Sequence, residues 1–191
     1  MKLALILVSG LMLTTAAASV VQPIPAGQKI GLARYFQAGY GGLKTDLIAA
    51  AEKMPEGDYG FKPSSMADVR AYGQLFAHVA ESQFGTCATV KGVPNPSQRK
   101  SLEQVLKTKA EFVKALADSF AFCDDVFSSL TDASAMEFVK LGQGEVVRGA
   151  VLAGLLAHNS EMYGISTVYL RAKNLVPPST ERQMQRQPPP R

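Results

Sequence analysis

The stretch that decides the fold is EVVRGAVLAGLLAHNSEMYGISTVYLRAKN, residues 145–174. Its apolar residues recur every three or four positions, which is the period of one face of an α-helix. A histidine belongs to this stripe, which consists of Val151, Leu155, His158, Met162, Ile165 and Tyr169. Pro177 and Pro178 end the pattern, because proline cannot continue a helix. The segment therefore predicts a long helix with an imidazole on its buried face.

Three earlier segments have the same period, and the residues between them do not alternate as strands do. They predict helices over 30–54, from Ser64 or Ser65 to about 89, and over 98–130. The connection 131–144 is expected to be irregular, with a turn at its glycines. Long amphipathic helices of this kind pack as an all-α four-helix bundle. Periodicity does not give the order in which the helices pack.

The two ends of the chain differ from this helical region. Residues 1–18 combine Lys2, an apolar run and an alanine-rich site, as a cleavable signal peptide does. Residues 19–29 form a lead-in, the bundle is expected over 30–179, and the Pro/Gln/Arg-rich residues 180–191 are expected to be disordered. The mature protein is therefore predicted to be periplasmic or secreted, with no stable membrane insertion after cleavage.

The net charge of +4 comes largely from the two ends. Lys2 leaves with the signal peptide, and the last residues contain three arginines against one glutamate. Between them, basic and acidic residues are nearly equal in number. Nucleic-acid binding needs a clustered basic surface, so no nucleic-acid partner is expected.

The chain contains two cysteines, Cys87 and Cys123. In an exported protein such a pair is a candidate disulfide. The alternative is two reduced, buried thiols. The residues are too far apart in sequence for a CxxC redox motif.

Four sequence motifs, in this order, resemble the DinB-like superfamily of metalloenzymes, and its exported members most of all. They are EKMPEGDYGFKP (52–63), DVRAYGQLFAHVAES (68–82), KAEFVKALADSFAFCDD (109–125) and LLAHNSEMYGISTVYLRAKNLVPPS (155–179). The resemblance implies a four-helix bundle that holds a divalent metal, commonly zinc or nickel. It also implies three histidine ligands, one from the second helix and an HxxxH pair from the last.

This chain departs from that pattern at the third ligand. His78 matches the histidine of the second helix and His158 the first of the pair, but Met162 stands where the second would be. A thioether is a weak ligand for zinc or nickel, so the site is either occupied by two histidines with Met162 or vestigial and metal-free. In the vestigial case the two histidines are hydrogen-bonded core residues. Glu161 is a weak candidate for a general base.

Three functions remain open at the level of sequence. The first is a metal-dependent hydrolase or transferase acting on an unknown small molecule. The second is a non-catalytic bundle that binds a small ligand. The third is an oligomerising bundle, for which a homodimer is the expected assembly.

Overall fold

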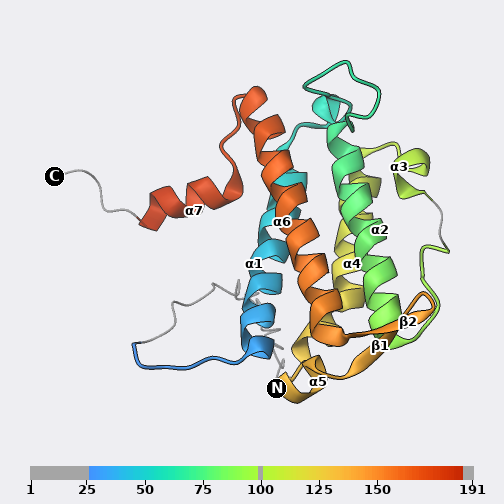
Figure 1. The fold of residues 1–191 in the computed structure, drawn as a ribbon. Helices are drawn as coiled ribbons and strands as arrows, with labels where there is room; N and C mark the ends of the chain where they lie inside the picture. Colours follow the sequence, from blue (N-terminus) through green and yellow to red (C-terminus); the bar gives the residue numbers. More distant parts are fainter. Residues whose placement is uncertain (1–25, 99–100, 187–191) are drawn as a thin grey trace, which may run out of the picture.

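A computed structural model of the chain describes residues 26–98 and 101–186. Four long helices dominate it: α1 (Leu32–Lys53), α2 (Tyr72–Lys91), α4 (Lys109–Ser128) and α6 (Arg148–Ala172). They lie side by side as a bundle (Figure 1). The expected all-α four-helix bundle is confirmed.

The first two long helices of the chain are not direct neighbours in the bundle. Both α1 and α2 pack against α4 and α6, so α1 and α2 lie at opposite corners. Figure 1 shows that α2 and α4 run in one direction and α1 and α6 in the other. The connection from α2 to α4 therefore returns along the whole length of the bundle. It carries the short helix α3 (Leu102–Val105).

The interior of the bundle is rich in aromatic side chains, and the polar tips of its tyrosines are satisfied. The hydroxyl of Tyr72 donates to the Ala50 carbonyl at 2.6 Å, and that of Tyr40 to the Phe120 carbonyl at 2.8 Å. A buried hydroxyl without an acceptor would cost roughly 1–3 kcal/mol. These bonds tie α1 to α2 and to α4, and so fix which faces meet.

Two helix boundaries differ from the sequence expectation. The second long helix starts at Tyr72 rather than at Ser64 or Ser65, because residues 62–71 form turns and bends. The predicted helix over 98–130 is interrupted after α3. Thr108 caps α4 through the Glu111 N–H, and the Glu111 carboxylate accepts the Thr108 N–H at 2.9 Å. This reciprocal capping box starts a new helix at Lys109.

The connection expected to be irregular contains regular structure. After the short helix α5 (Asp132–Ala135), strands β1 (Phe138–Leu141) and β2 (Gly144–Val147) pair in antiparallel register. Gly142 has φ +62°, a conformation that favours glycine, and makes the two-residue turn between them possible. The hairpin packs against α2 and α6 at one end of the bundle.

The C-terminal residues were expected to be disordered, and this is wrong for those that the structure describes. Pro178–Arg186 form helix α7, which is held by side-chain contacts to α1. Glu181 pairs with Lys53 at 2.6 Å, and Arg182 pairs with Asp46, whose side chain is 13% exposed. Composition suggested a solvated tail, but these specific ion pairs order it.

Among residues 26–98 and 101–186, no helix has the length and apolar character needed to cross a membrane. The predicted signal peptide, residues 1–18, lies outside the described residues, as does much of the lead-in 19–29. Those two assignments stay predictions.

Candidate metal site

The two histidines face each other across the α2–α6 interface. His78 belongs to α2 and His158 to α6, and their ring centroids are 5.0 Å apart with planes tilted by 55°. Both side chains are partly exposed rather than sealed in the core. The structure thus brings together two residues that are separated by most of the bundle in sequence.

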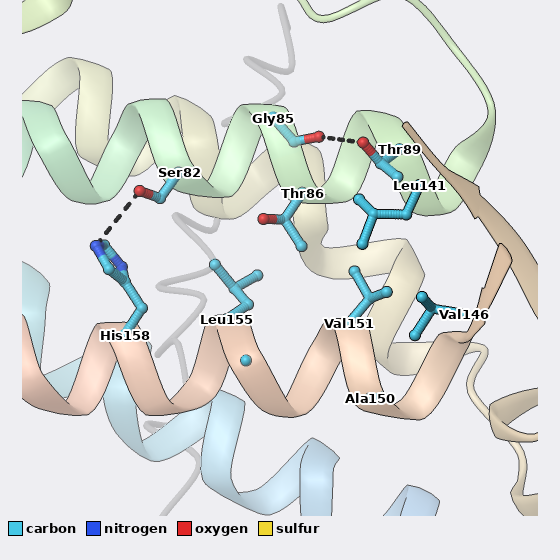
Figure 2. A pocket seen from close by; sticks show the side chains of 11 residues that line it. Ser82, Gly85, Thr86, Thr89, Leu141, Val146, Ala150, Val151, Leu155 and His158 are labelled. Carbon is cyan, nitrogen blue, oxygen red and sulfur yellow. Dashed lines mark hydrogen bonds between the residues drawn. The ribbon is translucent and has the colours of Figure 1, made fainter. Parts of the chain in front are cut away.

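Little of the hydrogen-bonding capacity of His158 is used by the protein. Its Nε2 makes one long contact, 3.4 Å to the Ser82 hydroxyl (Figure 2), and its Nδ1 is buried without a partner. Burial, followed by the nearby charge of His78, lowers the pKa of His158 below its usual 6.5. The imidazole is therefore neutral at pH 7, which is the form that binds a metal.

Two polar atoms next to this histidine are also unsatisfied. Asn159 is fully buried, and neither its Oδ1 nor its Nδ2 has a hydrogen-bond partner among the described residues. On the α6 side of the histidine pair, several buried polar atoms therefore lack a hydrogen-bond partner among the described residues.

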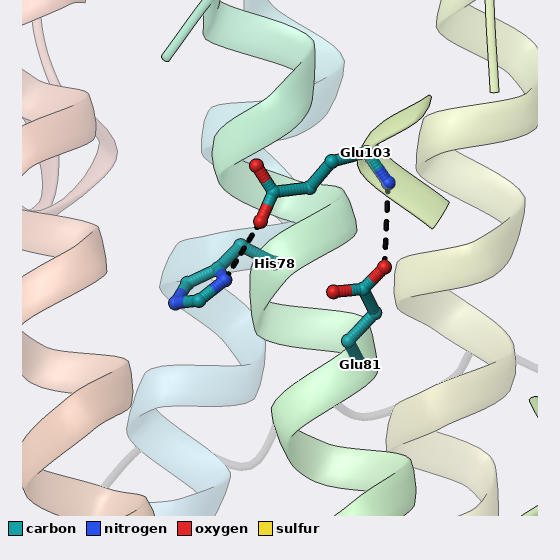
Figure 3. Close-up of side chains that lie close together, drawn as sticks. All are labelled: His78, Glu81 and Glu103. Carbon is teal, nitrogen blue, oxygen red and sulfur yellow. Dashed lines mark hydrogen bonds and ion pairs between the residues drawn. The ribbon is translucent and has the colours of Figure 1, made fainter. Parts of the chain in front are cut away.

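His78 is held more tightly, by residues that sequence reasoning did not find. Its Nδ1 lies 2.8 Å from Oε1 of Glu103, on α3. A carboxylate only accepts hydrogen bonds, so Nδ1 donates a proton to Glu103 and Nε2 is the ring nitrogen left free of this contact. Figure 3 shows that Nε2 points away from Glu103 toward α6. Arg70 anchors Glu103 from the other side, with Nε 2.9 Å from Oε2.

A second acidic residue lies close to this pair. His78, Glu81 and Glu103 each offer one ligand atom, and these atoms lie within 4.8 Å of one another, so this cluster could hold a metal ion. In the structure, however, Glu81 caps α3 by accepting the N–H of Leu102 and, at 3.4 Å, that of Glu103 (Figure 3). Glu81 therefore positions the helix that carries Glu103.

The other two residues singled out from the sequence lie apart from these contacts. Met162 is buried among the core residues and is 4% exposed. Glu161 is exposed on the outer side of α6. Neither side chain makes a hydrogen bond or ion pair among the described residues.

Cys87 and Cys123 are joined by a disulfide, with Cα atoms 5.6 Å apart. Both are fully buried, and they link α2 to α4. The bridge lies on a different interface from the histidines and does not contribute to their site. Its role is structural.

The sequence contains a motif that bears on Glu103, but its consequence is visible only in the folded structure. The capping box Thr108–Glu111 marks the break that frees α3 from α4, and a free α3 is what lets Glu103 reach His78. Arg70 could not be placed, because Tyr169 on α6 fixes its backbone by donating to the Arg70 carbonyl at 2.8 Å. That contact spans 99 residues.

A four-helix bundle with two histidines facing each other across two helices is an arrangement that could hold a metal ion. A family model of the DinB superfamily matches residues 43–162, which is more than half of the chain. This protein therefore belongs to the DinB superfamily. No curated protein matches the chain.

Proposed function

We propose that this protein is a metal-dependent hydrolase or transferase whose divalent ion, zinc or nickel, is held by His78 and His158. The observation that carries the proposal is the facing pair of imidazoles, with ring centroids 5.0 Å apart, in which the protein uses little of the hydrogen-bonding capacity of His158. Imidazole nitrogen is a ligand that both metals accept. A bound ion with an open coordination position would polarise a substrate oxygen.

The chain's own residues prepare this site in a definite way. Glu103 holds the proton on Nδ1 of His78, and so presents Nε2 to the ion. Arg70 neutralises the charge of Glu103 and keeps it in place. The Ser82 hydroxyl lies 3.4 Å from Nε2 of His158 and can accept or donate a hydrogen bond there.

The alternative ligand set is His78 with Glu81 and Glu103. The Arg70 guanidinium argues against it, because its Nη2 lies 3.3 Å from Nδ1 of His78. A divalent ion at that nitrogen would meet a fixed positive charge. The Nε2 side faces His158, which is neutral.

Metal analysis tests the proposal directly. The mature, untagged protein is purified and its zinc, nickel and copper are measured by mass spectrometry, together with His78→Ala and His158→Ala. We expect zinc or nickel in the native protein and a loss in both variants. The metalloenzyme proposal would be overturned if the native protein contained none of these metals and its melting temperature did not rise when they were added.

A gain-of-binding variant examines the third ligand position. Met162 lies one helical turn from His158, so the two residues share a face of α6. Met162→His should raise zinc affinity, and adding His78→Ala should remove the gain. No gain in a folded variant would mean that the three positions do not converge.

A non-catalytic role in binding a small ligand is the second candidate. It is favoured by Met162, since a thioether in the third position weakens any zinc or nickel site. A metal-free native protein that still binds a small ligand would favour the non-catalytic role over the metalloenzyme.

We also propose that the protein is exported to the periplasm or secreted. The Cys87–Cys123 disulfide supports this, because such bonds persist in oxidising compartments. Sequencing the N-terminus of the secreted or periplasmic form tests it: the proposal requires cleavage close to residue 18.

A further inference from the structure

An open groove runs between α2 and α6 from the histidine site to the hairpin. It has a volume of ≈ 700 Å³, within the range of small-molecule sites of roughly 300–1,000 Å³. His158 and Ser82 lie at one end, and Leu141 and Val146 of the hairpin lie at the other (Figure 2). The groove and the candidate metal site therefore share one residue, His158.

The lining of the groove carries no charged side chain. The α6 side is aliphatic, through Val151 and Leu155, while α2 contributes small hydroxyl residues such as Thr86. A phosphate, a charged peptide or a polyamine would find no counter-charge along this length. A hydrocarbon chain would lose contact with water without leaving any charge unpaired.

The groove is open beside a glycine on α6. A Cβ atom added at Gly154 would meet no other atom within 4 Å, so the space beside it is free. Glycine is unfavourable in a helix interior compared with alanine, and packing does not require it here. From His158 to Ala150 the groove follows α6 for about 12 Å, at 1.5 Å per residue. That is close to the length of an extended octyl chain and short for a protein partner.

We propose that this groove binds the hydrocarbon chain of a small amphipathic substrate whose polar head lies at His78 and His158. The position of the head rests on the proposed metal site, whereas the chain-binding part rests on the groove alone. The substrate class is therefore an acyl or alkyl compound with an uncharged chain of medium length and a metal-binding or hydrogen-bonding head.

Alkyl hydroxamates of two lengths test this. Acetohydroxamate carries the head with almost no chain, and octanohydroxamate carries the same head with a chain that fills the groove. Binding of each is measured by calorimetry to the full mature protein, whose metal content is determined first. We expect octanohydroxamate to bind roughly a hundredfold more tightly, which allows for a groove that covers the chain on one side only.

A matched pair of variants locates the chain. Gly154→Leu places a side chain in the groove, and Gly164→Leu adds the same side chain to α6 at another position where a Cβ meets no atom within 4 Å. Gly164 does not line the groove. Gly154→Leu should abolish the chain-length advantage, and Gly164→Leu should preserve it. Melting temperatures confirm that both variants fold.

The outcomes separate the two proposals. Equal affinity for both probes in the native protein, or a chain-length advantage that survives Gly154→Leu, overturns the chain-binding groove even if metal is bound. A metal-free protein that keeps the advantage, and loses it in Gly154→Leu, overturns the metal site and leaves the groove standing.

Discussion

Glu103 is the residue on which the geometry of the candidate site depends most. It lies 25 residues from His78 in sequence and 2.8 Å away in space. The sequence predicted that His78 and His158 meet, because both lie in apolar helical segments and match one family pattern. It could not predict Glu103, whose place depends on a helix break and on the Arg70 ion pair.

Replacing Glu103 should weaken metal binding without removing a ligand. Loss of a carboxylate that orients a ligating histidine typically costs about 10–100-fold in affinity, and we expect this for Glu103→Ala. Glu103→Gln keeps an oxygen that accepts the Nδ1 proton and should lose less. Competition with a chromophoric chelator measures both. If Gln falls as far as a ligand deletion such as His78→Ala, the carboxylate binds the metal itself.

The titration of His158 should make the metal-free protein less stable in mild acid. Burial, followed by the charge of His78, lowers the folded-state pKa, so the unfolded chain takes up its proton first, near 6.5. The stability that neutral His158 contributes is present above about pH 6.5 and is lost as pH falls through the lower folded-state pKa. Urea denaturation between about pH 7.5 and 5 should show a shallower loss for His158→Gln than for the native protein. Parallel curves would contradict this.

At the scale of elements, the predicted helix boundaries were wrong where a few capping or turn residues determine the structure. The long helices were predictable because their apolar stripes extend over many turns. The break before α4 and the hairpin were not, since each depends on a few residues, Thr108 with Glu111 in one case and Gly142 in the other. Helix α7 needed partners on α1 that composition cannot reveal.

The start of α2 provides a test of how closely the elements pack. A Cβ at Gly73 would lie 2.7 Å from Phe112 on α4 and 2.9 Å from Tyr59, too close for either ring to stay in place. Gly73→Ala should therefore lower the free energy of unfolding by about 1–3 kcal/mol, through overpacking. Gly154→Ala is the control and should raise it by up to about 1 kcal/mol, from helix propensity alone. Chemical denaturation compares them, and a stabilised Gly73→Ala would refute the close packing.

At the scale of the whole molecule, the disulfide joins the two parallel helices. It closes a loop with a sequence separation of 36 residues, which restricts the unfolded chain. Replacing Cys87 and Cys123 by alanine together should cost about 2–4 kcal/mol of unfolding free energy. Urea denaturation of the variant and of the oxidised native protein measures this. Equal stability of the two would show that the bundle does not need the bridge.

The loop closed by that bridge has a second consequence, for how the protein must be prepared. It contains α3 and Glu103, so the covalent link also confines the carboxylate that orients His78. A chain folded where thiols stay reduced would have the same histidines with a less restrained partner for Nδ1. Two preparations with identical sequences and different oxidative histories should then differ in metal content. The thiol titre of a sample therefore has to accompany any metal measurement made on it.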